Sequence, residues 1–431
     1  MAINEGKIIV GVDVGTYKIV TIIARVVEDV VNVLGVSEVK SSGIRKGQVV
    51  DIEEAVSAIN SSIEAAERMA GYNAAHIIAS IGGSQIESQN SRGVVAASSP
   101  KGEITEDDLA RVIDAARAIS LPSTRGIIHV LPRNYIVDGQ EGIKDPVGMS
   151  GVRLEVDTHI VTANTVAVTN LEKAYSKVGV DVDSFVFSGY ASSLSALNDT
   201  EKELGVILVD IGAGTTDISI YTEGSSSYSS VLAIGARHVT NDIAIGLRIS
   251  LESAEKIKLF LSQNLTKKTI TTDEETPHAK PSDELDLSSL NLPEEITKVS
   301  QKTLVEGIIR PRLNEIFTMI GLEIKKSGFG GQTPAGIVIT GGGAMTVGIK
   351  EAARRTLAMP VRIGIPINIK GIIDEVQHPA FSTVLGLTIY GAKNTQGKSA
   401  SSFRLNRAMG SFSGTGKIFK KILEIIKSFI P

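Results

Sequence analysis

Two segments of this chain, about 200 residues apart, share one pattern, and this repetition limits what the chain can fold into. Residues 7–25 and 206–221 each consist of a short β-branched strand, a turn of glycine and threonine, and a second strand. An aspartate precedes each turn, Asp13 in the first segment and Asp210 in the second. Apolar runs joined by glycine turns predict β-hairpins with each aspartate at the mouth of a buried strand. The repetition predicts duplicated halves.

The two turns carry the groups that a complex of a triphosphate and a metal ion needs. Backbone N–H groups cradle phosphate oxygens, and Mg²⁺ is held by carboxylates, usually through water. Glycines let the backbone approach closely, threonines offer hydroxyl groups, and the two aspartates would face each other across a cleft; the residues are Gly15, Thr16, Gly212, Gly214, Thr215 and Thr216, with Asp13 and Asp210. The alternative for either turn alone is an aspartate that only caps its own hairpin.

A third strand ends in Gly341-Gly342-Gly343, followed by Ala344. Such a turn suits a planar adenine lying on backbone where a β-carbon would clash. An ordinary turn between a strand and a helix is the alternative. Together with the two hairpins, the turn favours a nucleotide site.

Composition excludes several classes of protein. The 431 residues, 42% of them hydrophobic, correspond to two or three folding units. A formal charge of −4 gives no overall positive field for nucleic acid, and the absence of cysteine excludes disulfides, thiolate catalysis and cysteine-ligated zinc. The first residues lack the features of an export signal, and no apolar run reaches the roughly 18 residues of a spanning helix. We therefore expect a cytosolic protein unless another feature attaches it to a membrane.

The segments between the hairpins predict further elements. Residues 51–71 form an amphipathic helix with an aspartate N-cap and a C-terminal glycine, and residues 85–165 form an inserted subdomain whose helix begins after Thr105. Polar residues 267–289 predict an exposed loop. A helix is expected from about Glu294, with a break or a new start at Pro311.

The end of the chain differs from the rest. Residues 394–416 have linker composition, and residues 417–431 have a helical period with a local charge of +3. The apolar face consists of Ile418, Phe419, Ile422, Leu423, Ile425, Ile426, Phe429 and Ile430, and the cationic face of Lys417, Lys420, Lys421 and Lys427. This pattern predicts a membrane-binding helix, because the apolar side chains can enter the acyl layer while the lysines contact anionic headgroups. A helix that packs back on the body is the alternative.

Three motifs resemble those of the actin, heat-shock ATPase and sugar-kinase superfamily, namely residues 11–16, 209–217 and 339–344. Further stretches resemble the FtsA family of bacterial division proteins, and these are residues 129–132, 135–140, 145–154 and 240–244. The resemblance covers about residues 6–395 and the terminal helix.

The resemblance implies an α/β, actin-like two-lobed ATPase fold of duplicated ribonuclease-H-like halves with an FtsA-type inserted subdomain. Its expected boundaries are 1–84 with 166–204 for subdomain 1A, 85–165 for 1C, 205–240 with 331–393 for 2A, and 241–330 for 2B. The linker and the membrane helix would follow.

The resemblance also implies a site for ATP and Mg²⁺. Asp13, Gly15, Thr16, Tyr17 and Lys18 would face the phosphates from one side, and Asp210, Gly212, Ala213, Gly214, Thr215 and Thr216 from the other. Asp13 and Asp210 would hold the metal through water. Glu255 and Lys258, one helical turn apart, would line the base and ribose, the alternative being a surface ion pair. Tyr17 departs from the family pattern, in which small hydroxyl residues are common at this position of the loop that contacts the nucleotide. No residue that activates the attacking water is identified, so at most slow hydrolysis is expected.

Partners follow from the same resemblance. It implies the C-terminal peptide of FtsZ bound within residues 241–330, with Arg312 and Arg310 as the candidate contacts, although Arg312 could also be a solvated surface residue. It further implies nucleotide-sensitive filaments, other division proteins, and a peripheral position on the cytoplasmic face of the inner membrane at the division site. The alternatives are a metabolite kinase of the same superfamily and an actin-like pilus-assembly adaptor, which should lack the terminal helix; a chaperone is disfavoured because no peptide-binding β-domain follows.

Overall fold

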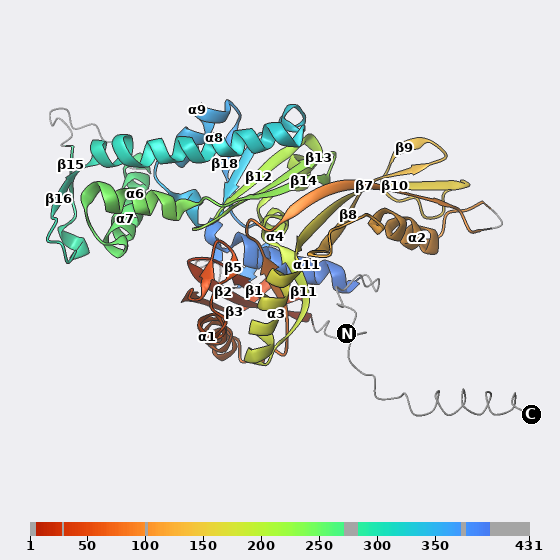
Figure 1. Cartoon of the computed structure of the whole chain (residues 1–431), viewed down its shortest axis with the longest axis horizontal. Helices are drawn as coiled ribbons and strands as arrows, with labels where there is room; N and C mark the ends of the chain where they lie inside the picture. Colours follow the sequence, from red (N-terminus) through yellow and green to blue (C-terminus); the bar gives the residue numbers. More distant parts are fainter. Residues whose placement is uncertain (1–5, 28–29, 100–101, 271–282, 372–375, 397–431) are drawn as a thin grey trace, which may run out of the picture. The chain divides into compact units, whose positions relative to one another are not determined.

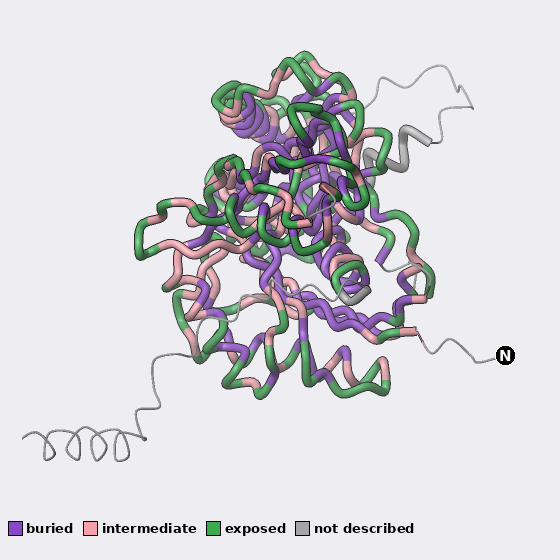
Figure 2. The backbone as a smooth tube through the Cα atoms, turned by 90° about the vertical axis from the view of Figure 1, so that its right-hand side faces the viewer, coloured by how far each residue is buried: buried purple, intermediate pink, exposed green. Residues whose placement is uncertain are grey.

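The computed structural model describes residues 6–27, 30–99, 102–270, 283–371 and 376–396. Three sheets organise this part of the chain, with six, five and four strands (Figure 1). Buried residues concentrate on the strands of these sheets and on the helix faces that pack against them (Figure 2).

The six-stranded sheet has the order β11-β6-β1-β2-β3-β19. Its strands are β1 (Lys7–Val14), β2 (Lys18–Val27), β3 (Val30–Lys40), β6 (His76–Ile81), β11 (Asp181–Phe187) and β19 (Ile369–Gly371). Alternate residues of β1 point to opposite faces, so Val12 packs in a core with helices α1 (Ile52–Ala70) and α3 (Thr165–Val178). Ile9 packs on the other face with α11 (Ser382–Gln396). The first predicted hairpin is confirmed as the antiparallel pair β1 and β2.

The five-stranded sheet repeats this arrangement with the order β14-β13-β12-β17-β18. Its strands are β12 (Val206–Ile211), β13 (Thr216–Thr222), β14 (Ser225–Leu232), β17 (Ile337–Thr340) and β18 (Val361–Ile363). As in the first sheet, a three-stranded antiparallel meander begins with a strand that also pairs in parallel with a later one. The second predicted hairpin, β12 and β13, is therefore confirmed. Helix α4 (Ser188–Ala196) contributes to the core on one face.

The four-stranded sheet lies within the predicted insertion and has the order β7-β10-β8-β9. Its strands are β7 (Glu87–Ala96), β8 (Arg125–Val137), β9 (Gln140–Ile143) and β10 (Arg153–Asn164). Helix α2 (Glu106–Arg117) covers one face and begins, as predicted, with Thr105 and Asp108 in a reciprocal capping box. The predicted caps of α1 are also present, since the Asp51 side chain accepts from the Glu54 N–H and Gly71 is left-handed.

The edge strands β7 and β14 meet through side chains. The Ser88 hydroxyl donates to the Ser229 carbonyl at 2.7 Å, and the Asn90 amide donates to the Ser227 carbonyl at 3.2 Å. His159, 1% exposed, bonds to Asn90 and to the Ser229 hydroxyl. We call this contact the serine seam; it joins the inserted sheet to the sheet of the second hairpin.

Helices α6 (Ala236–Leu247), α7 (Leu251–Ile270), α8 (Arg310–Ser327) and α9 (Ile349–Leu357) share the core on the other face of the five-stranded sheet. The remaining short elements are α5 (Asp199–Leu204), the β4 and β5 pair (Ile44–Arg45, Gln48–Val49), and the 3₁₀ turns η1 (Ser288–Leu290), η3 (Gly330–Gln332), η4 (Gly342–Met345) and η5 (Pro379–Phe381).

The prediction of an exposed loop at residues 267–289 is wrong at both ends of this segment that the structure describes. Helix α7 continues to Ile270, and β15 (Glu284–Asp286) pairs with β16 (Lys298–Ser300). Leu287 is fully buried in the core, so a few apolar anchors in a polar segment suffice to fold its end. Residues 271–282 lie outside the described part.

The helix predicted from Glu294 begins later, and of the two alternatives for Pro311 the new helix start is confirmed, because α8 begins at Arg310. A π-helical segment, η2 (Thr303–Ile309), runs directly into α8, where Pro311 occupies the first turn. The Arg310 N–H bonds to the carbonyl of Val305, five residues back. This wider turn accommodates a residue that has no N–H to donate.

Near its end the described chain stays helical to Gln396, beyond the expected start of the linker at residue 394. The predicted membrane helix at 417–431 lies outside the described residues. Within the described ranges, no helix has the length and apolar character needed to cross a bilayer.

Candidate nucleotide site

The two hairpin turns have the same geometry and touch each other. The Gly15 N–H donates to the Lys18 carbonyl at 3.0 Å, and the Gly212 N–H donates to the Thr215 carbonyl at 2.9 Å. A β-carbon added to Gly214 would lie 2.9 Å from the Thr16 hydroxyl oxygen. The predicted turns from the two halves of the chain are therefore brought together, and Gly214 must be glycine for them to approach so closely.

Asp210 lies at the end of β12 and is 5% exposed. Its Oδ2 accepts hydrogen bonds from the hydroxyl groups of Ser192 on α4 and Thr383 on α11. Burial raises the pKa of Asp210 to about 6, the Ser192 bond opposes this rise, and the charge of Asp13 adds to it. The two predicted metal carboxylates thus act on each other electrostatically.

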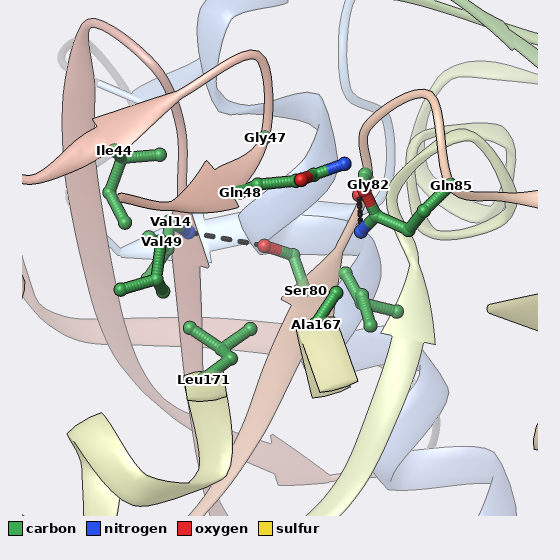
Figure 3. A pocket seen from close by; sticks show the side chains of 11 residues that line it. Val14, Ile44, Gly47, Gln48, Val49, Ser80, Gly82, Gln85, Ala167 and Leu171 are labelled. Atoms are coloured by element: carbon green, nitrogen blue, oxygen red, sulfur yellow. Dashed lines mark hydrogen bonds between the residues drawn. The ribbon is translucent and has the colours of Figure 1, made fainter. Parts of the chain in front are cut away.

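Asp13 lies near the end of β1 and is half-buried. Burial raises its pKa, whereas a hydrogen bond from Ser80 and the positive charge of Lys18 lower it. The Ser80 oxygen also accepts from the Val14 N–H at 3.1 Å (Figure 3). Strand β6 therefore orients Asp13 through Ser80, as α4 and α11 orient Asp210.

A third carboxylate, Asp217, belongs to this cluster and was not among the predicted site residues. It is the cross-strand partner of Asp210, so both side chains lie on one face of the sheet. Its Oδ1 is buried and has no hydrogen-bond partner among the described residues. Burial, followed by repulsion from Asp210 and Asp13, raises its pKa well above the usual range.

Three carboxylates with raised pKa values fit a hard cation, because such an ion would offset their desolvation and mutual repulsion. Within the part of the chain that the structure describes, no group of three acidic or histidine side chains is close enough to ligate a metal directly. The expected mode of binding, through metal-bound water, does not need such a group.

Lys18 and Tyr17 occupy the first turn in different ways. The Lys18 ammonium lies 2.6 Å from Glu38 and 4.3 Å from the centre of the Phe381 ring. Tyr17 is 47% exposed, and its pKa is raised by partial burial and by the charges of Glu255 and other acidic residues. Tyr17 therefore lies near α7 of the other half of the chain.

Glu255 and Lys258 form a buried network rather than a surface pair. Lys258 is 7% exposed and donates to Glu255 at 2.7 Å and to the Thr240 hydroxyl at 2.9 Å. The Thr240 hydroxyl in turn donates to Glu255 at 2.5 Å. Helices α6 and α7 thereby hold a fixed pair of charges close to Tyr17.

The three glycines after β17 do not have equal roles. A β-carbon on Gly341, whose φ is +82°, would lie 2.1 Å from Asp210 Oδ1, and one on Gly343 would lie 2.5 Å from the Ile211 side chain. Gly342 is exposed, and Ala380 is its nearest neighbour at 3.9 Å. Packing against β12 therefore requires two of the glycines, and only Gly342 presents open backbone. Ala344 is 3% exposed and belongs to the core.

The second turn also differs from expectation at individual residues. The Thr216 hydroxyl is buried and donates to the Ile234 carbonyl at 2.8 Å, so it does not face the first turn, whereas Thr215 is half-buried. The carbonyls of Gly212 and Ala213 accept from the first N–H groups of α6. The loop thus both faces the first hairpin and caps a helix.

Both arginines predicted to bind the FtsZ peptide are paired within the chain. Arg312 donates to both carboxylate oxygens of Asp242, at 2.5 and 2.9 Å, and to Glu315. Arg310 pairs with Glu306. The Arg312 pair joins α8 to α6.

A small cavity lies beside the first turn, between the β4 and β5 hairpin and the turn that follows β6 (Figure 3). It has room for about one water molecule. The Gly47 N–H at the hairpin tip donates to the Thr16 hydroxyl at 3.2 Å. Gln85 donates to the Gly82 carbonyl, while its buried Oε1 has no partner among the described residues.

Two family models match the chain. The model for the SHS2 domain inserted in FtsA matches residues 83–162, and the model for cell division protein FtsA matches residues 207–386. Curated relatives match almost the whole length. The cell division protein FtsA of Pseudomonas aeruginosa is 40% identical over 433 residues, which cover 100% of this chain and 99% of the relative. That of Escherichia coli K12 is 34% identical over 421 residues, which cover 95% and 96%.

Solved structures share the fold at low sequence identity. A protein of the PilM-PilN type IV pilus biogenesis complex has a TM-score of 0.62 at 15% identity, over 89% of this chain and 98% of that one. MreB5 of Spiroplasma citri bound to ADP has a TM-score of 0.52 at 14% identity, over 91% and 99%. These similarities confirm the predicted actin-like fold. With both family models and full-length relatives in agreement, the chain belongs to the FtsA family of cell division proteins.

Proposed function

We propose that this FtsA-family protein binds ATP and Mg²⁺ between its two hairpin turns and links FtsZ filaments to the cytoplasmic membrane. The observation that carries the proposal is the contact between two equivalent turns, each with a carboxylate whose charge acts on the other. The fold neighbour MreB5, whose structure contains ADP, supports nucleotide binding by this fold.

In this proposal the phosphates lie against the backbone of the first turn at Gly15 and of the second at Gly212 and Gly214. The Mg²⁺ ion, held through water by Asp13 and Asp210, would neutralise the charge of the triphosphate. Asp217, which has an oxygen without a partner, would accept a hydrogen bond from a water in the ion's shell. The Lys18 ammonium, which pairs with the Glu38 carboxylate in this structure, would pair with a phosphate when nucleotide binds.

The base and ribose would lie between the charged pair of α7 and the exposed backbone of Gly342. Glu255 and Lys258 are already fixed by Thr240, so nucleotide binding would not have to order them. We expect at most slow hydrolysis, because no side chain in the described part of the chain is identified as the group that activates the attacking water.

For FtsZ, we expect Arg312→Glu to weaken binding of the FtsZ C-terminal peptide at least tenfold without changing ATP affinity. An acidic peptide would compete with Asp242 for the Arg312 guanidinium, and the substitution reverses the charge that attracts it. Fluorescence anisotropy with the labelled peptide measures the dissociation constant.

Asp242→Asn is the matched control, because it removes the ion pair between α6 and α8 but leaves the Arg312 guanidinium in place. We expect this variant to bind the peptide at least as tightly as the unmodified chain. An unchanged peptide Kd for Arg312→Glu, or equal losses in both variants, would remove Arg312 from the site.

For the membrane, we expect the full chain to float with anionic liposomes and to carry FtsZ with it. A chain that ends at Gly416 should stay in the soluble fraction, because it lacks the lysines and the apolar residues of 417–430. Neutral liposomes should recover less of the full chain. Equal flotation of the two chains would refute the tail as the anchor.

Filament formation is the remaining part of the proposal. Sedimentation of the full chain on lipid, with and without ATP, should show more pelleted protein with nucleotide. An equal amount of pelleted protein in both conditions would contradict the expectation that filament assembly depends on nucleotide.

A further inference from the structure

The hairpin of β4 and β5 carries an unusual residue at its tip, beside the first hairpin turn of the candidate nucleotide site. Arg45 pairs with Gln48, so Lys46 and Gly47 are the two residues of the connecting turn. Both have a positive φ, +49° for Lys46 and +74° for Gly47. Such a turn favours asparagine followed by glycine, because these residues tolerate positive φ better than others. A lysine at the first position therefore indicates a use for its side chain.

Packing fixes this tip against the candidate nucleotide site. The Gly47 N–H donates to the Thr16 hydroxyl at 3.2 Å. On its other side, a β-carbon added to Gly47 would lie 2.8 Å from the backbone of Gly83, and one added to Gly83 would lie 2.7 Å from the Lys46 carbonyl oxygen. The tip thus lies between the first hairpin turn and the turn that follows β6, which Figure 3 shows at Gly82.

The base of the hairpin is fixed as well. The N–H groups of Val50 and Asp51 donate to the Gly43 carbonyl at 2.8 and 3.1 Å. Asp51 is also the N-cap of α1, so the hairpin is joined directly to that helix. A ligand that contacts the Lys46 side chain would therefore not have to order the backbone that carries it.

The Lys46 ammonium can reach the proposed phosphates. Lys46 is exposed and forms no ion pair with any residue in the described ranges, whereas Lys18 is paired with Glu38. With bond lengths of about 1.5 Å, an extended lysine places its Nζ about 6 Å from its own Cα. Because Lys46 directly precedes the N–H that bonds to Thr16, this reach includes the space beside the Thr16 hydroxyl.

Neighbouring residues of the first turn indicate which phosphate would lie there. Tyr17 lies near α7, where the base is proposed, whereas Thr16 contacts the hairpin tip. The turn after β6 leads further from α7, since a β-carbon added to Gly82 would lie 3.0 Å from Ser188 Oγ and 3.7 Å from Asp217 Oδ1. The hairpin therefore lies on the side of the site away from the base, where the terminal phosphate of ATP would be.

The charge balance of the site favours a cation at this place. Asp13, Asp210 and Asp217 repel one another, and ATP carries more negative charge than one Mg²⁺ ion neutralises. Lys18 is the cation that the first turn itself provides. A second ammonium, that of Lys46, would offset the repulsion between the terminal phosphate and the carboxylates.

We propose that Lys46 binds the terminal phosphate of ATP and makes the protein prefer ATP to ADP. This inference rests on the proposed nucleotide site and names the part of it that distinguishes the two nucleotides. ADP lacks the group that Lys46 contacts, so the tip of the hairpin retains ATP and does not retain ADP.

Calorimetric titration of the full chain with ATP and Mg²⁺, and separately with ADP and Mg²⁺, tests this assignment in Lys46→Asn. We expect the ATP Kd to rise at least fivefold and the ADP Kd to change less than twofold. Damage to the hairpin would weaken the binding of both nucleotides alike. The Tm should not fall, because asparagine followed by glycine is the favoured sequence for this turn.

Arg45→Gln is the matched control. Arg45 is exposed, has no ion pair within the described part of the chain and precedes the tip, so its loss changes the net charge equally but removes no proposed contact. We expect both Kd values to change less than twofold in this variant.

Equal losses of ATP affinity in the two variants would overturn Lys46 as a contact, as would an unchanged ATP Kd in Lys46→Asn. A parallel rise of the ADP Kd in Lys46→Asn would refute the assignment to the terminal phosphate. These results presuppose an unmodified chain that binds ATP. If that chain bound neither nucleotide, the proposed function would fail, and this inference with it.

Discussion

Replacing Gly341 with alanine should destabilise the protein by about 2–4 kcal/mol and abolish nucleotide binding. The residue has a φ of +82°, and a β-carbon there would lie 2.1 Å from Asp210 Oδ1 and 2.7 Å from the Ile211 carbonyl oxygen. Strain at positive φ and overpacking each cost roughly 1–3 kcal/mol. Relief of the clash would displace the Asp210 carboxylate. Urea unfolding and calorimetric titration with ATP and Mg²⁺ measure the two effects.

Gly342→Ala is the matched control for this substitution. Its nearest neighbour would be 3.9 Å from the added carbon, so we expect a change in stability of at most about 1 kcal/mol. Because the proposed base lies on Gly342, ATP affinity should still fall. Equal destabilisation by the two substitutions would contradict the different roles assigned to the glycines.

Asp210→Asn should change binding and stability in opposite directions. We expect affinity for ATP with Mg²⁺ to fall at least tenfold, because the metal loses a charged partner. The nucleotide-free protein should become more stable by about 1–3 kcal/mol at pH 7.5, since the substitution removes a buried charge whose pKa is raised from 3.8 to about 6. Loss of a charged hydrogen-bond acceptor for Ser192 and Thr383 keeps the gain below the full linkage value.

The pH dependence of this gain has a definite sign. A carboxyl group with a raised pKa stabilises the folded state while it is protonated, and this contribution is lost as the pH rises from about 4 to about 6. The unmodified protein and Asp210→Asn should therefore have similar stabilities below pH 4 and differ above pH 6. Denaturant unfolding across this range is the measurement. A variant that is less stable at neutral pH, or that binds ATP with unchanged affinity, would contradict the assignment of Asp210.

The sequence predicted the two hairpins and the α1 and α2 caps because these features depend on local patterns. Alternating apolar residues place Val12 and Ile9 on opposite faces, and Asp51 and Thr105 mark helix starts through their own hydrogen bonds. The contact between Gly214 and Thr16 joins residues far apart in the chain, and only the repetition of the motif indicated it.

Other features depend on contacts that local pattern does not report. Asp217 could have been identified from strand pairing, because it lies opposite Asp210 once the register is known. The partners of Lys18 and Arg312, namely Glu38 and Asp242, come from other elements of the fold. The π-helical turn before Pro311 likewise depends on packing in the core rather than on propensity.

A crystal structure of the chain grown with ATP and MgCl₂ tests the central claim most directly. We expect one magnesium ion linked through water to both Asp13 and Asp210, with the phosphates between the turns at Gly15 and Gly214. A nucleotide bound elsewhere, or a metal ion out of reach of one of these aspartates, would contradict the shared site.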